Sequence, residues 1–156
     1  MSRVISKKRN TQIDPKYKSA QIAKLINYIM ERGKKSIAQK IVYQALEDLE
    51  KKTKTPAPSA LARAFDNIAP ILEVRSRRIG GANYQVPIEV SEKRKETLAM
   101  RWIIEFSKKR KGAPMWQRLS TELFDAYQNQ GAAIKRREDT HKMAEANRAF
   151  AHFARM

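Results

Sequence analysis

The sequence contains no cysteine, only two histidines and only five glycines in 156 residues. The absence of cysteine excludes disulfide bonds, thiolate zinc sites and cysteine nucleophiles, and it is compatible with a reducing compartment. No run of about 18 apolar residues is present, so no segment is long and apolar enough to span a bilayer. We therefore expect no membrane partner.

Acidic residues are also scarce. Lys and Arg number 33 against 16 Asp and Glu, which gives a formal net charge of +17. A chain with this charge repels itself unless a polyanion neutralises it, and nucleic acid is the leading candidate. With 42% hydrophobic residues, residues 1–156 suit a single domain with one core. The basic residues 1–13 are expected to form a flexible arm that binds RNA, although an organellar transit peptide has a similar composition.

Residues 71–90 alternate in character with period two on either side of a Gly-Gly pair, which predicts a β-hairpin. A three-residue turn from Gly80 to Ala82 would place Ile79 opposite Asn83 and gather the apolar residues on one face. We expect that face to dock on the rest of the protein. The residues expected to project outward, either to contact nucleic acid or to protect a sheet edge from aggregation, are Arg75, Arg77, Arg78 and Tyr84.

Apolar residues at spacings of three and four predict helices over most of the remaining chain. Capping residues, glycines and prolines set their boundaries. The boundaries are Ser19 to Gly33, Ser36 to about 50, Ser59 to Pro70, Ser91 to Gly112, Pro114 to about Tyr127, and about Ala132 to Phe153, with a charged linker from Lys51 to Pro58. The predicted fold is mainly α, a single domain of about six helices with one protruding hairpin (about 71–90) between helices three and four.

The short link Gly33-Lys34-Lys35-Ser36 has some likeness to a nucleotide-binding P-loop. That motif needs a second glycine where Tyr28 stands and a Ser or Thr where Lys35 stands. The P-loop interpretation therefore fails. Two alternatives remain, a basic turn that binds phosphate and a turn that only meets solvent.

His141 and Glu145 are spaced like metal ligands on a helix, with Glu138 and Asp139 one turn earlier. A third convincing ligand is missing, because His152 is the only other histidine. We therefore expect no enzyme and no cofactor. A metal-dependent nuclease built on these four residues is the enzymatic alternative, and a DNA-compacting protein is the alternative binding function.

Four stretches in this order resemble small-subunit ribosomal protein seven of the bacterial and organellar type, over about residues 14–153. The stretches are Gly33-Lys34-Lys35 with Ile41, Val42 and Ala45, then Ser76 to Gly81 with Tyr84 to Pro87, then Leu98 to Trp102, and finally Lys135 to His152.

This resemblance implies a structural constituent of the small ribosomal subunit, on the ribosome in the cytoplasm or in an organelle. It implies direct binding to the 3′ major domain of 16S-type rRNA, nucleation of assembly of the subunit head, and a position near messenger RNA and the exit-site tRNA. Ribosomal proteins nine and eleven are the expected protein neighbours.

The candidate site residues follow from the resemblance together with the positions of the basic clusters. Residues expected to bind rRNA are Arg3, Lys7, Lys8, Arg9, Lys34, Lys35, Arg75, Arg77, Arg101, Lys108, Lys109, Arg110, Lys111, Lys135, Arg136 and Arg137. Residues expected near messenger RNA and tRNA are Arg78, Gly80, Gly81, Asn83, Tyr84, Lys142 and Arg148.

Overall fold

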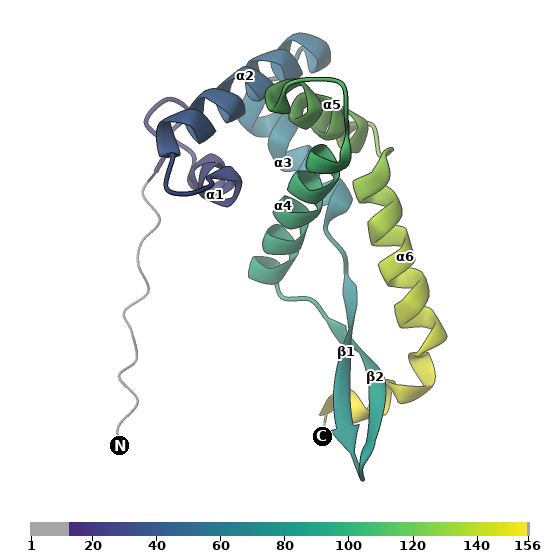
Figure 1. Cartoon of the computed structure of the whole chain (residues 1–156). Coiled ribbons are helices and arrows are strands. Elements are labelled where there is room, and N and C mark those ends of the chain that lie inside the picture. The colour runs from purple at the N-terminus through teal and green to yellow at the C-terminus, as the bar shows by residue number, and fades with distance from the viewer. Residues whose placement is uncertain (1–12, 156) are drawn as a thin grey trace, which may run out of the picture.

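The computed structural model describes residues 13–155 as a helical head with a hairpin extending from it (Figure 1). The elements are α1 (Ala20–Ile29), α2 (Lys35–Thr53), α3 (Ala57–Ile68), β1 (Leu72–Ile79), β2 (Ala82–Glu89), α4 (Glu92–Lys109), α5 (Met115–Tyr127), α6 (Ala132–Ala146) and a 3₁₀ helix η1 (Arg148–Arg155). The predicted fold class is confirmed within these residues. The flexible RNA-binding arm predicted at residues 1–13 lies almost wholly outside the described residues.

Most helix starts follow the sequence signals, and Ser19 caps α1 by accepting the N–H of Ile22 at 3.4 Å. Two starts were wrong. α2 begins at Lys35 without a side-chain cap, so Ser36 is already helical. α3 begins at Ala57, two residues before the predicted Ser59, because Pro58 fits the first helical turn, where a missing N–H costs nothing.

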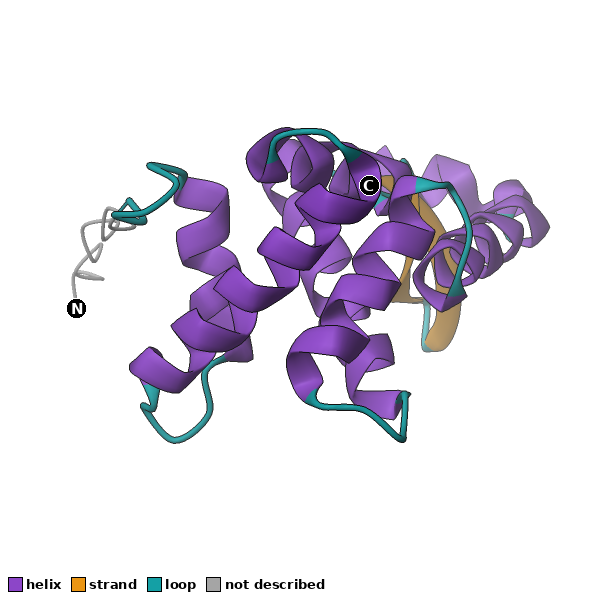
Figure 2. Ribbon diagram, turned by 90° about the horizontal axis from the view of Figure 1, so that it is seen from above, coloured by secondary structure: helices purple, strands orange, loops and turns teal. Residues whose placement is uncertain are grey.

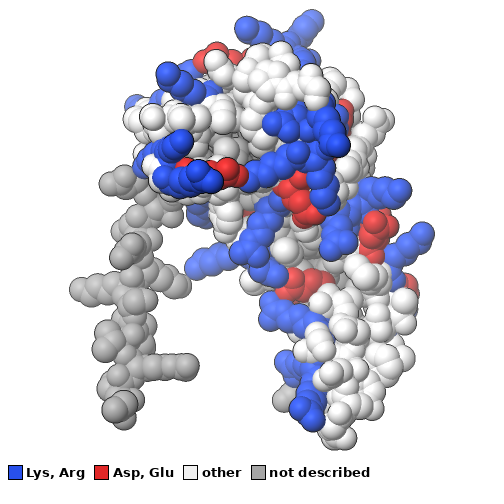
Figure 3. All heavy atoms as spheres, viewed as in Figure 1, with Lys and Arg blue, Asp and Glu red and all other residues white. Residues whose placement is uncertain are grey.

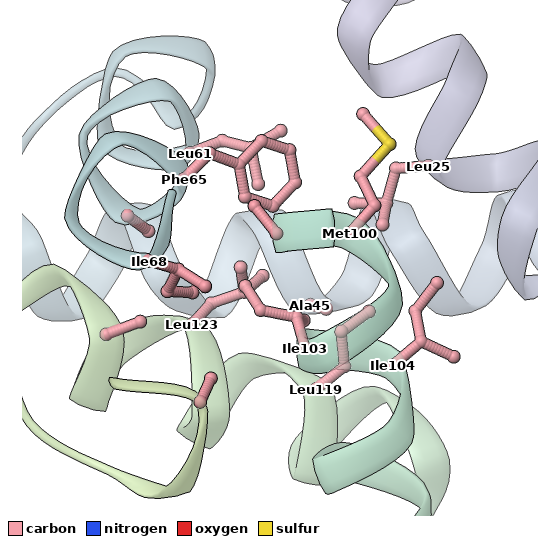
Figure 4. Packing of buried hydrophobic residues seen from close by; sticks show 14 of the residues in the cluster. Leu25, Ala45, Leu61, Phe65, Ile68, Met100, Ile103, Ile104, Leu119 and Leu123 are labelled. Atoms are coloured by element: carbon pink, nitrogen blue, oxygen red, sulfur yellow. The ribbon is translucent and has the colours of Figure 1, made fainter. Parts of the chain in front are cut away.

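One apolar core joins all six α-helices of the head. Leu25 of α1, Leu61 of α3, Met100 of α4 and Leu123 of α5 are fully buried. Their side chains point into the space between the helices, where Leu25 lies next to Met100 (Figure 4). Ile134 of α6 joins the same cluster. Seen from above, the strands lie under the side of the head away from the N-terminal end (Figure 2). The hairpin therefore extends from a rigid base.

The hairpin register differs from the prediction. Ile79 pairs with Ala82, Arg77 with Tyr84 and Val74 with Pro87, so Gly80 and Gly81 alone form the loop. Both glycines have positive φ, +56° and +87°, as a tight type I′ turn requires. The prediction assumed one buried face, but the neighbours Val86 and Pro87 are both buried although they point to opposite faces. Because both faces of the hairpin are partly buried here, the apolar residues do not have to lie on the same face, and the two-residue loop is allowed.

The sixth helix is shorter than predicted. α6 ends at Ala146, and the chain tightens into η1 instead of continuing as an α-helix to Phe153. The 3₁₀ segment turns back towards the tip of the hairpin (Figure 1), where its aromatic side chains contact β2. Contact with the hairpin thus replaces the helical continuation that the periodicity favoured.

Buried carboxylates brace the ends of the helices. Glu122 of α5 is 1% exposed, accepts Nε of Arg110 at 2.8 Å, and accepts the backbone N–H of Ala133 at 3.1 Å. One side chain thus joins the end of α4 to the start of α6. Asp14, which is 2% exposed, accepts the hydroxyl of Tyr43 at 2.6 Å. Burial and this hydrogen bond raise the pKa of Tyr43 to about 12.

Replacing Glu122 with Ala should lower the free energy of unfolding by about 2–4 kcal/mol, because Arg110 and the N–H of Ala133 lose a shared buried partner. Chemical denaturation monitored by circular dichroism measures the change. The matched control is Glu105→Ala, which removes the exposed ion pair with Lys109 and should change stability little. Equal losses in both variants would show that Glu122 is not a brace.

Candidate nucleic-acid interface

The C-terminal 3₁₀ helix η1 packs against one face of the hairpin, the face that carries Arg77 and Tyr84. Tyr84 of β2 packs against Phe150 and Phe153, with ring centroids 5.3 and 5.1 Å apart. Arg77, opposite Tyr84 in β1, donates from Nη1 to the carbonyl oxygen of Phe153 at 3.0 Å. The expectation that Arg77 and Tyr84 project outward was wrong, because the true register turns both toward η1.

Arg75 and Arg78 do project outward, as predicted, and both are exposed. The carboxylate of Glu73 connects the base of the hairpin to the head. It pairs with Arg75 at 2.6 Å and with Arg94 of α4 at 3.2 Å. One acid thus holds cations from two elements beside each other.

Arg94 also begins a row of cations along α4. Arg94, Arg101 and Lys108 are spaced seven residues apart, which places them on one face of the helix with about 10 Å between successive members. Lys108 forms an ion pair with Glu31, a residue of the turn between α1 and α2. That turn also carries the exposed Lys34, and Lys35 follows it at the start of α2.

The ion pairs of Glu73 and Glu31 and the helical spacing on α4 link most of these cations, and we call the whole set the basic strip. It consists of Lys34, Lys35, Lys108, Arg101, Arg94, Arg75 and Arg78, and Arg78 lies nearer the hairpin tip, on the other face of β1 from Arg75. Lys and Arg side chains follow one edge of the hairpin and continue over the lower part of α4, whereas the opposite edge of the hairpin is nearly free of charge (Figure 3). Arg94 was missed by the sequence reasoning, although its spacing from Arg101 and Lys108 was a usable signal.

Several candidate residues have contacts within the protein. Arg110 is held by Glu122 and Asp125, and Arg137 donates to the carbonyl oxygen of Asn67. Arg110 thus connects the end of α4 to α5, and Arg137 connects α6 to the end of α3. Lys109 and Arg148 form exposed pairs with Glu105 and Glu145. Such exposed pairs are weak enough for a phosphate to replace the carboxylate.

The remaining candidates are either exposed on the surface or lie outside the described residues. Among residues 13–155, these exposed cations have no salt bridge: Lys34, Lys35, Arg78, Arg101, Lys111, Lys135, Arg136 and Lys142. Gly80, Gly81 and Asn83 are exposed at the tip of the hairpin. Arg3, Lys7, Lys8 and Arg9 lie outside the described residues.

His141 has a structural contact. Its Nε2 accepts the backbone N–H of Ile71 at 3.0 Å, which joins α6 to the base of the hairpin. Burial, together with the nearby Arg137, lowers the pKa of His141 and favours the neutral ring that this bond needs. Residues 13–155 contain no group of three or more His, Asp or Glu side chains arranged to hold a metal ion.

Two neighbouring arginines on opposite faces of β1 offer a test of the contact between η1 and the hairpin. Arg77→Ala removes a hydrogen bond worth about 1 kcal/mol, so the amides of β2 and η1 should exchange about fivefold faster. Hydrogen exchange read by NMR gives the rates. Arg78→Ala removes an exposed side chain one residue away and should leave those rates unchanged. Identical exchange in the two variants would contradict the assignment of the faces.

Within residues 13–155, no helix has the length and apolarity needed to cross a bilayer.

Comparisons with known proteins agree with the motif resemblance. The ribosomal protein S7p/S5e family matches residues 1–148. The chain is 57% identical over 145 residues to small ribosomal subunit protein uS7 of Thermosipho africanus, covering 93% of this chain and 94% of that protein. Identity to the protein of the same name is 52% over 151 residues in Marinobacter nauticus, with 97% of each chain covered. In Mycobacterium avium it is 54% over 146 residues, with 94% of each chain covered. This chain therefore belongs to the ribosomal protein S7p/S5e family, whose members are structural ribosomal proteins and not enzymes.

Proposed function

We propose that this protein binds the 3′ major domain of 16S-type rRNA and nucleates assembly of the head of the small subunit. The observation that carries the proposal is the basic strip, which brings together cations from separate parts of the fold. Its seven cations come from the turn between α1 and α2 with the first residue of α2, from α4 and from the hairpin. Family membership supports an rRNA partner.

The strip suggests how binding organises RNA. Phosphate contacts fix the orientation of a protein on RNA, and cations on separate elements can hold phosphates from separate RNA helices. The core joins α4, α1 and α2 in one rigid unit, so RNA helices bound to these elements are held at a fixed angle. A multi-helix junction is thereby kept in its folded geometry.

The hairpin serves a second part of the proposal. Its exposed tip, with Arg78, Gly80 and Gly81, extends away from the head, and we assign it to the path of messenger RNA and the exit-site tRNA. The nearly uncharged surface beside β2 (Figure 3) suits a protein neighbour better than RNA, because it offers phosphates few cations. Ribosomal proteins nine and eleven are the neighbours we propose.

A salt titration tests whether the strip binds RNA. If about seven phosphates are neutralised, log affinity should fall against log salt with a slope of about −5 to −6, a loss of about three orders of magnitude between about 50 and 200 mM salt. The measurement is fluorescence anisotropy with a transcript of the 3′ major domain. Arg101→Ala should reduce the slope by about one. A slope near zero, or tighter binding to duplex DNA than to the transcript, would refute the proposal.

A further inference from the structure

An apolar notch opens beside the basic strip. It has a volume of about 550 Å³ and lies where the turn between α1 and α2, the end of α4 and the start of α5 come together. Its apolar walls are formed by Ile29, Ile37, Ala38, Ile41 and Met115. Its polar rim consists of Lys34, Lys108, Arg118 and Glu31.

The walls combine buried and exposed apolar surface. Ile29 and Ala38 are 5% and 3% exposed, whereas Ile37 is 52% exposed. Ile37 therefore forms a lip in contact with solvent, beside the lysines at positions 34 and 35. Covering this lip would remove apolar surface from water, which is favourable at about 25 cal/mol per Å².

The charges on the rim favour an anion. Three cations stand against one carboxylate, and that carboxylate, Glu31, already pairs with Lys108. Arg118 is held in place because its Nη1 donates to the carbonyl oxygens of Arg110 and Lys108 at 2.8 and 3.3 Å. The ligand should thus carry negative charge next to a flat or compact apolar part.

A larger cleft elsewhere on the protein lacks the excess of cations found at the notch. It measures about 960 Å³ and lies between α3, α6 and the start of α4. Its five carboxylates outnumber its four cations, which are Lys93, Lys95, Arg137 and Lys142. Phosphate gains no net attraction there, so size alone does not select the site.

We propose that the apolar notch takes one unstacked nucleotide of the bound RNA, with the base against Ile37 and Ile41 and the flanking phosphates on Lys34 and Lys108. The inference rests on the proposed function, because the notch borders the strip along which the RNA would run. A base within a duplex cannot enter, since its face is stacked and its edges are paired. Protein–RNA recognition commonly uses such splayed bases.

The charges also argue against the protein's own N-terminal residues as the occupant. Residues 1–12 contain Arg3, Lys7, Lys8 and Arg9 and no acidic residue. Their charge has the same sign as the rim. An RNA phosphate has the opposite sign and suits it.

Replacing Ile37 with Ser tests the notch through affinity and salt dependence together. Affinity for the 3′ major domain transcript should fall about five- to tenfold, because apolar burial is lost. The salt slope should stay unchanged, since no cation is removed. Lys34→Ala should instead reduce the slope by about one. The matched control is Ile71→Ser, which alters an isoleucine that is 64% exposed outside the notch and should leave affinity unchanged.

A second measurement reports entry of a base directly. NMR of isoleucine methyl groups in the full-length protein would be recorded with hexaadenylate and with a short RNA duplex. The single strand should shift the methyl signals of Ile37 and Ile41 upfield through the ring current of the base, and the duplex should not. Equal shifts with both probes would overturn the inference, as would an Ile37→Ser variant that binds like the wild type.

The outcomes also separate this inference from the function on which it rests. If the wild-type protein binds the transcript with a steep salt slope while the notch variant is unaffected, only the notch fails. If the wild-type protein does not bind the transcript, the proposed function fails as well. Methyl shifts caused by an acidic apolar peptide, and by neither RNA, would assign the notch to a protein partner and refute the nucleotide.

Discussion

Repulsion among 33 cationic side chains, opposed by only 16 acidic ones, is the constraint on which this structure depends. The described chain uses several of its acids as connectors between elements. Glu122 joins α4, α5 and α6, Glu73 joins the hairpin to α4, and Glu31 joins α4 to the turn between α1 and α2. Each connector also holds a cation in place, so stabilising the fold and arranging the positive surface are achieved by the same contacts.

The hairpin depends on a different interaction. It adds little to the main core, and a two-stranded ribbon alone is marginally stable in water. Its cover comes from α6 and from η1, where Phe150, Phe153 and the carbonyl oxygen of Phe153 contact Tyr84 and Arg77. The two arginines at positions 77 and 78 thus have separate roles. One holds the ribbon in shape, and the other is presented to solvent.

The sequence predicted those parts of the fold that local signals determine. Helical spacing and the proline and glycine boundaries placed α4 and α5 well, and the alternating pattern located the hairpin. The start of α1 was also right, but α1 ends at Ile29 and not at Gly33 as predicted. The errors occurred where distant residues decide. The hydrogen bond that turns Arg77 inward is made to Phe153, 76 residues away, and this contact has no local signature. In the candidate site, exposed lysines and arginines were identified from the motifs, whereas the internal roles of Arg110 and Arg137 became visible only when their partners were in place.

The central claim is that RNA is bound along the basic strip and not over the whole positive surface. Covalent labelling of lysine amines, read by mass spectrometry with and without a transcript of the 3′ major domain, tests it most directly. Lys34, Lys35 and Lys108 should be protected by the RNA. Lys51, Lys52 and Lys54, at the other end of a helix about 28 Å long, should react as they do in the free protein. Equal protection of the two groups would contradict the account.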